Sequence, residues 1–216
     1  SDSTFFSNSA DRGFAIFNAS SASSCQIHHS LFRQNTGNSG TVTNYSSMAI
    51  FNSTISANYS TNLAFAGIDN EDSGQLRMQS CTLANQGNSS SLSNGGTVFL
   101  SDNIFLAPTG QTNFWSRGTW NSGGYNIFND NSYPGALNTG DLLNTDPMLG
   151  TLGNYGGPTW THSLPANSPA VNHRPGKCTT TLYTIEDDQR HKARSDGSCD
   201  TGAFELGAVY LPFLTR

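Results

Sequence analysis

The chain is poor in charged residues. Only 12% of its 216 residues are Asp, Glu, Lys or Arg, which is about half the share found in an ordinary soluble domain. Lysine occurs only at Lys177 and Lys192, and the net charge is −5. The sequence therefore lacks the basic footprint of a nucleic-acid-binding domain and the polybasic patch that attracts a protein to an anionic membrane surface.

Long apolar runs are also missing. The longest, at residues 208–214, is far too short to cross a bilayer, so we expect no transmembrane segment. The chain opens on the polar residues SDSTFFSN, which we interpret as the start of a mature or trimmed product. The four cysteines include no CxxC pair, and no histidines have finger-like spacing, so we expect no zinc site.

Ser, Thr, Asn and Gly take the place of the charged residues. Few of the strong helix formers Lys, Glu and Ala remain, which argues against amphipathic helices. Asn, Gly and Ser favour tight turns between strands. Because 11% of the residues are aromatic, the polar composition does not indicate disorder.

A pattern of the form apolar-x-Asn repeats through the first half of the chain. Its asparagines lie 26, 26 and 24 residues apart. We expect its apolar members to stack in one interior row, formed by Ile16, Val42, Ile68 and Leu92. The asparagines, which are Asn18, Asn44, Asn70 and Asn94, form either a hydrogen-bonded ladder or separate turns with positive φ.

A second pattern has two apolar residues five positions apart, as in IHHSLF at residues 27–32 and IFNSTI at residues 50–55. Such ends face opposite sides of a straight strand, so a corner between them is needed to bring both inside. We expect a second interior row formed by Phe5, Phe32, Ile55, Leu83 and Ile104. Short strands in turns of about 25 residues predict a right-handed parallel β-helix over residues 1–107, in which each turn buries its apolar face on its neighbours.

The regular pattern fades after Ile104. Residues 108–216 are predicted to form final irregular coils and a cap over the end of the solenoid, where unpaired strand edges must be covered. Aromatic residues in this stretch indicate either a carbohydrate-stacking surface or clusters under long loops. They are Trp115, Trp120, Tyr125, Phe128 and Tyr133.

Several motifs of the second half occur in an order that we recognise. They are DPMLG at residues 146–150, NYGGPTWTHSLPANSPA at 154–170, DQRHKAR at 188–194 and CDTGAFE at 199–205. Together with NSTISAN at 52–58, they make the chain resemble bacterial secreted parallel β-helix proteins of the "choice-of-anchor Q" type. The resemblance implies a secreted or cell-surface β-helix but no particular activity. His191 stands where the family motif usually has glycine.

The same motifs bracket Cys178 and Cys199, so we expect a disulfide bond between them. Cys25 and Cys81 fall at different positions of the repeat and are expected to be unpaired and buried.

Catalytic chemistry has little support in the sequence, and we expect no catalytic residues. The acidic residues Asp69, Glu71 and Asp72 are interpreted as a solvated loop, or as a Ca²⁺ site without EF-hand spacing. His28 and His29 are expected to point to opposite faces of a strand. Asp187 to Arg190, together with Arg194, is expected to form an ion-paired turn that holds the cap.

These patterns support a non-enzymatic extracellular protein, structural or adhesive in role. Two alternatives remain: a carbohydrate-binding module for surface glycans, and a degenerate polysaccharide lyase or hydrolase. The sequence opens with the pattern of a coil's closing strand, so we expect the open edge at Phe5 to recruit an apolar tail from a second copy and to build a filament. The alternative is that further coils or a cap precede this strand. That tail contains Val209, Tyr210, Leu211, Phe213 and Leu214.

Overall fold

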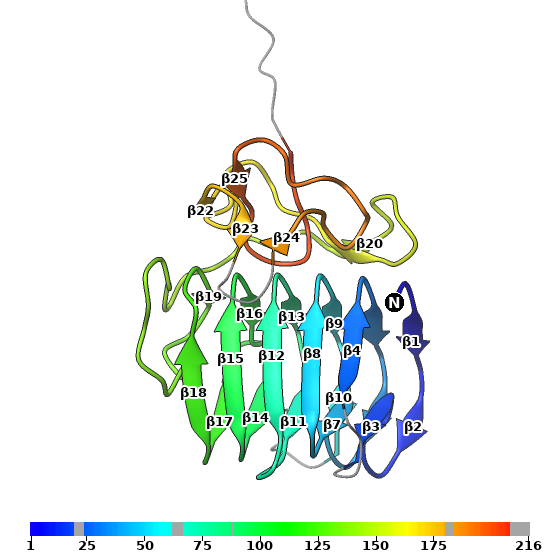
Figure 1. Ribbon diagram of the computed structural model, residues 1–216. Coiled ribbons are helices and arrows are strands. Elements are labelled where there is room, and N and C mark those ends of the chain that lie inside the picture. The colour runs from blue at the N-terminus through cyan, green and yellow to red at the C-terminus, as the bar shows by residue number, and fades with distance from the viewer. Residues whose placement is uncertain (20–23, 62–66, 88, 180–183, 208–216) are drawn as a thin grey trace, which may run out of the picture.

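The computed structural model describes residues 1–19, 24–61, 67–87, 89–179 and 184–207. Within these ranges the protein contains strands and turns and no helix, so no described helix could span a membrane. Parallel strands stack into a solenoid of about five turns, which confirms the predicted parallel β-helix (Figure 1).

Three parallel sheets form the walls of the solenoid. Sheet 1 contains β3 (Ile16–Asn18), β7 (Val42–Asn44), β11 (Ile68–Asn70), β14 (Leu92–Asn94) and β17 (Phe114–Ser116). Sheet 2 contains β4 (Cys25–His28), β8 (Ser47–Phe51), β12 (Gln75–Gln79), β15 (Thr97–Ser101) and β18 (Thr119–Ser122). Sheet 3 contains β1 (Thr4–Phe6), β5 (Leu31–Arg33), β9 (Thr54–Ser56), β13 (Thr82–Ala84), β16 (Ile104–Leu106) and β19 (Ile127–Phe128).

Shorter strands complete the chain. A fourth parallel sheet joins β2 (Ser9–Ala10), β6 (Thr36–Gly37) and β10 (Tyr59–Ser60). Three small antiparallel pairs follow the solenoid: β20 (Leu152–Gly153) with β21 (Thr161–His162), β22 (Arg174–Pro175) with β25 (Ser198–Cys199), and β23 (Cys178–Thr179) with β24 (Thr184–Ile185).

The first predicted interior row is confirmed. Ile16 pairs with Val42, Val42 with Ile68, and Ile68 with Leu92 in the register of sheet 1. The row continues to Phe114. Val42, Ile68 and Leu92 are fully buried, and Ile16 packs on the same core from the end of the sheet. Each turn of the solenoid therefore covers the apolar face of the next.

The second row is confirmed except for its last member. Phe5, Phe32, Ile55 and Leu83 are in register in sheet 3, but the next residue in the row is Phe105. Ile104 pairs with Thr82 and faces the opposite side of the sheet. The prediction was wrong because β15 carries two consecutive apolar residues, Phe99 and Leu100. The pattern was counted from Phe99, which faces outward, so its second apolar position fell on Ile104 instead of on Phe105. A one-residue shift exchanges the two faces of a strand.

A left-handed residue turns the chain from sheet 2 into sheet 3 in each coil. The corner residues have φ between 42° and 58°, and they are His29, Asn52, Ser80, Asp102 and Tyr125. The predicted corner therefore lies between the two apolar residues of the pattern. The next residue, such as Ser53, begins the turn into sheet 3 with its hydroxyl bonded to the Phe51 carbonyl. The side chains of these corner residues point away from the interior of the solenoid, along one of its sides.

The asparagines of sheet 1 form a continuous ladder. Asn18 Nδ2 donates to Asn44 Oδ1 and Asn44 Nδ2 to Asn70 Oδ1, both at 2.7 Å, and Asn70 Nδ2 donates to Asn94 Oδ1 at 2.8 Å. None of the four has a positive φ, which decides between the two expectations in favour of the ladder. A second ladder that the sequence analysis did not identify follows β1, β5, β9 and β13, and it joins Asn8, Asn35, Asn58 and Gln86.

Replacement of Asn70 by alanine is expected to lower the free energy of unfolding by about 1–3 kcal/mol, because buried polar groups lose their partners. Asn70 is fully buried and also donates to the Gly74 carbonyl. Urea unfolding of Asn70→Ala measures the loss, with the exposed Asn131→Ala as the matched control. Equal stability of the two variants would show that the ladder contributes nothing.

Residues 150–179 and 184–207, called here the flank region, lie along the side of the solenoid rather than over its end (Figure 1). Their contacts extend from the corner at His29, whose carbonyl accepts from the Thr159 hydroxyl, to the corner at Tyr125, whose carbonyl accepts from the Thr201 hydroxyl. The irregular C-terminal region that the sequence predicts is therefore present, and it covers the side of the solenoid. The physical reason is that the outer face of sheet 3 offers both apolar and hydroxyl groups. Ile104 and Ile127 pack against Leu164, Ala170 and Phe204 of the flank region. Thr54 and Thr82 make hydrogen bonds to Gln189 and to the Ala203 backbone of the same region.

The end of the solenoid is covered by the aromatic residues that follow β17. Trp120, Phe128 and Tyr133 join the main core, and the Tyr133 ring stacks on Phe128 at 4.8 Å. Tyr125 instead lies under the Arg174 guanidinium. Of the five aromatics considered for sugar stacking, Trp115 is exposed.

The predicted Cys178–Cys199 disulfide is confirmed. Cys25 and Cys81 are free, as expected, and occupy different rows: Cys25 aligns with Met48, whereas Cys81 lies at the corner beside Gln79. Cys81 is buried, and burial raises the pKa of its thiol to about 12. Cys25 is only half-buried, against expectation, because β4 is the edge strand of sheet 2.

Candidate functional sites

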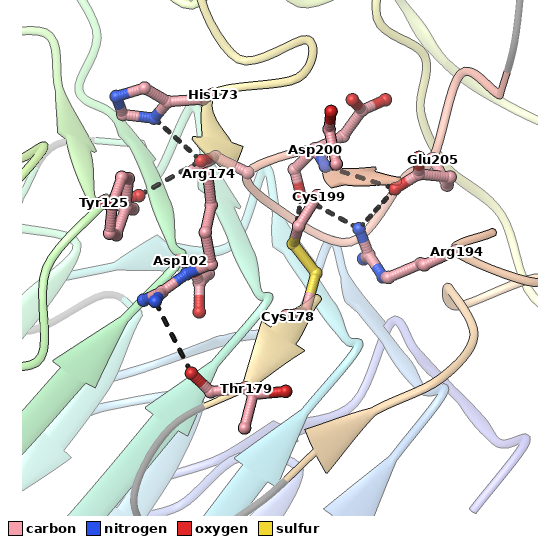
Figure 2. The surroundings of a disulfide bond; sticks show 12 residues. Asp102, Tyr125, His173, Arg174, Cys178, Thr179, Arg194, Cys199, Asp200 and Glu205 are labelled. Atoms are coloured by element: carbon pink, nitrogen blue, oxygen red, sulfur yellow. Dashed lines mark hydrogen bonds and ion pairs between the residues drawn. A yellow bond between two sulfur atoms is a disulfide. The ribbon is translucent and has the colours of Figure 1, made fainter. Parts of the chain in front are cut away.

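A buried ion pair and several hydrogen bonds attach the flank region to the solenoid, and further buried ion pairs lie within the flank region. Arg174 pairs with the corner residue Asp102, and Arg194 pairs with Glu205 at 2.9 Å. In the view of Figure 2 the disulfide lies between these two pairs. A third pair joins Arg190 to Asp188. The predicted ion-paired turn is thus present, with Glu205 as the partner of Arg194.

Gln189 makes the most direct polar link in this turn. Its Oε1 accepts from the Thr54 hydroxyl at 2.6 Å, and its Nε2 donates to the Thr159 hydroxyl at 2.8 Å. All three residues are buried. Most of the DQRHKAR motif therefore holds two parts of the fold together and is not exposed to a ligand.

The outer face of sheet 1 carries a shallow groove of about 330 Å³. Its lining is polar and charged, and consists of Asp11, Arg12, Asn38, Ser39, Asp69, Glu71 and Arg117. The outward row across the sheet runs Phe17, Thr43, Asp69, Ser93, Trp115. Two exposed aromatic side chains therefore stand at the ends of a row whose middle is polar.

Asp69 is the most perturbed group of this groove. It is 6% exposed, and burial together with the nearby Glu71 carboxylate raises its pKa from 3.8 to about 6. Glu71 accepts a hydrogen bond from the Tyr45 hydroxyl at 2.9 Å, and Arg12 donates to the same hydroxyl. The structure brings Asp69 and Glu71 to one groove, while Asp72 is exposed beside Gly95. The interpretation of Asp69 as part of a solvated loop is therefore wrong.

We expect Asp69→Asn to be more stable than the native protein at pH 7.5, by about 1–3 kcal/mol. The folded protein binds the Asp69 proton more tightly than the unfolded chain does. The stabilisation that the folded state gains by binding this proton is therefore complete below pH 3.8, and it is lost as the pH rises through about 6. Urea unfolding at pH 4.5 and 7.5 measures the change. The exposed Asp72→Asn is the control, and an Asp69 variant with the native pH dependence would contradict the argument.

A second hollow, of about 530 Å³, lies between the solenoid and the flank region. Two histidines meet at its edge: His29 from a solenoid corner and His191 from the flank region, with ring centroids 4.3 Å apart. Asp187 contacts both rings at 3.1 Å, and Asp2 Oδ1 lies 2.7 Å from His191 Nε2. Hydrogen bonds to Asp2 and Asp187 raise the pKa of His191 above its ordinary value.

This histidine cluster was not expected from the sequence. Asp2 and His191 are 189 positions apart, and no spacing rule connects them. The expectation that His28 and His29 face opposite sides of a strand is also wrong: β4 ends at His28, the chain turns at His29, and both residues line the hollow. The one sequence signal was the replacement of a motif glycine by His191.

Comparison with known protein families, curated proteins and solved structures finds no match to this chain. The resemblance to proteins of the "choice-of-anchor Q" type therefore stays a prediction. The predicted self-association tail, Val209, Tyr210, Leu211, Phe213 and Leu214, lies outside the described residues.

Proposed function

We propose that the protein is a non-enzymatic extracellular scaffold with a structural or adhesive role. The observation that carries the proposal is the use of its buried charges: Asp102, Asp188 and Glu205 each pair with an arginine that joins flank and solenoid or closes the flank on itself. Such pairs, with a packed interior and a disulfide, suit a stiff body. A structural disulfide also fits an oxidising compartment outside the cytosol.

Localisation and activity are tested separately. Fractionation of the native source should place the protein outside the cell or on its surface. The purified protein should release no reducing or unsaturated sugars from a panel of polysaccharides. Sugar release that disappears in Asp69→Asn would overturn the proposal, because a carboxyl of raised pKa beside a second carboxylate is also what glycoside hydrolysis uses.

Self-association is part of this proposal. Phe5 is a half-buried member of the interior row, with its ring stacked on Phe32 at 4.6 Å. Among the described residues, its strand β1 is the edge strand of sheet 3, and an apolar edge strand recruits a further strand. Sedimentation velocity and electron microscopy of the full chain should show concentration-dependent assembly, which Phe5→Lys should reduce and the exposed Phe17→Lys should not. Dispersed monomers at high concentration would contradict end-to-end assembly.

Glycan binding is the second candidate function, and the groove of sheet 1 is the observation that favours it. Phe17 and Trp115, 50% and 39% exposed, end an outward row of five strands. At about 4.8 Å per strand this row is about 19 Å long, enough for an oligosaccharide. The faces of aromatic rings pack on sugars, while Asp69, Glu71 and Arg117 offer hydrogen-bonding groups between them.

A glycan array followed by titration of any ligand found tests this candidate. Trp115→Ala should abolish binding, and Trp160→Ala should not, because Trp160 is similarly exposed but belongs to the flank region, beside Arg33. Equal binding by both variants would remove the groove as the glycan site.

A further inference from the structure

We propose that His29, His191 and Asp2 bind a divalent transition-metal ion, with Zn²⁺ as the best-suited ion, and that the bound ion fastens the flank region to the first turns of the solenoid. One ligand atom from each residue lies within 4.8 Å of the other two. Asp2 lies just before β1, His29 lies at a solenoid corner, and His191 lies in the flank region, so the ion would connect segments that are distant in sequence.

The donor set suits such an ion. Two imidazole nitrogens and a carboxylate oxygen are ligands that Zn²⁺ and its neighbours in the first transition row prefer. Ligand atoms about 2.0–2.2 Å from a tetrahedral ion lie about 3.3 Å apart. The distances between the ligand atoms must therefore change by at most about 1.5 Å. The side chains of His191 and Asp2 are 45% and 39% exposed, so both can turn toward an ion.

Asp187 is placed to orient the two rings. Its Oδ2 lies 3.1 Å from His191 Nδ1, which leaves His191 Nε2 directed at Asp2. Its Oδ1 contacts His29. A carboxylate on the second nitrogen of a ligating histidine is a common supporting contact in metal sites, where it sets the tautomer and the ring orientation. Two carboxylates beside two imidazoles also make the cluster attractive to a cation.

The backbone at His191 positions its side chain for this role. Its φ is +62°, a conformation that other turn residues of this fold share. This conformation places the His191 imidazole against the His29 ring, beside a hollow of about 530 Å³ from which a small ion or a water ligand can reach the cluster.

Isothermal titration of the chelator-treated full chain with ZnCl₂ tests the proposal, with CaCl₂ as the comparison ion. We expect one Zn²⁺ site and a Zn²⁺-dependent rise in Tm, since an ion that binds the folded state stabilises it. His191→Gly should weaken binding by more than about tenfold. This variant removes a ligand while glycine suits the local φ, so a folding defect is not expected.

His28→Asn is the matched control, because His28 lines the same hollow but is not in the donor set. It should bind Zn²⁺ as the native protein does. His29→Ala should behave like His191→Gly. The proposal is overturned if native protein binds no Zn²⁺, or if His191→Gly binds it as tightly as the native protein. Neither result bears on the proposed scaffold function, which does not depend on the ion.

Discussion

Truncation of Ile55 to alanine is expected to lower the free energy of unfolding by about 2–5 kcal/mol. Ile55 is fully buried in the middle of the solenoid, where its strand β9 lies between β5 and β13. Phe32 and Leu83 are its neighbours in the interior row. Because these neighbours are fixed in continuous parallel sheets, they cannot collapse into the space that a smaller side chain leaves, and the cavity remains.

Urea unfolding followed by circular dichroism measures this loss. Tyr59→Ala is the matched control, since Tyr59 belongs to the same coil but is 44% exposed and packs over Gly87. Truncation of Tyr59 should lower the free energy of unfolding much less than truncation of Ile55 does. Equal losses at the two positions would mean that stacking of interior rows is not what stabilises the solenoid.

Replacement of Arg194 by alanine is expected to lower the free energy of unfolding by a similar amount, about 3–5 kcal/mol, because it leaves a buried carboxylate without its partner. The side chains of Arg194 and Glu205 are each 1% exposed. The guanidinium also donates to the carbonyls of Asp200 and Gly202. These carbonyls would lose their donors in an interior that water does not reach.

The exposed Arg77→Ala is the control for loss of an arginine, since its guanidinium lies over Phe99 on the outside of sheet 2. Arg194→Lys should be intermediate, because lysine keeps the charge but cannot reproduce the planar set of donors. Limited proteolysis should cut the flank region of Arg194→Ala first. A variant as stable and as resistant as Arg77→Ala would contradict the role given to this pair.

The periodic features of the fold were predictable from the sequence. Ile16, Val42, Ile68 and Leu92 recur at nearly constant spacing, and a repeated residue in a solenoid meets its own copy in the next turn. The same reasoning identified the asparagine ladder. It failed at Ile104, where two adjacent apolar residues in β15 satisfy the pattern equally well and only the packed structure selects one register.

By itself, then, the sequence determined the β-helix, most of its two interior rows and its asparagine ladder, because stacked turns convert sequence spacing directly into contacts. The disulfide was anticipated through family-like motifs around Cys178 and Cys199.

Only the tertiary structure decided where the flank region lies. Its position depends on the packing of the flank region against Ile104 and Ile127 on the outer face of sheet 3 and on the ion pair between Asp102 and Arg174, which no repeat specifies. The meeting of Asp2, His29 and His191 follows from that docking, since residues without periodic spacing become neighbours only when separately folded segments pack together.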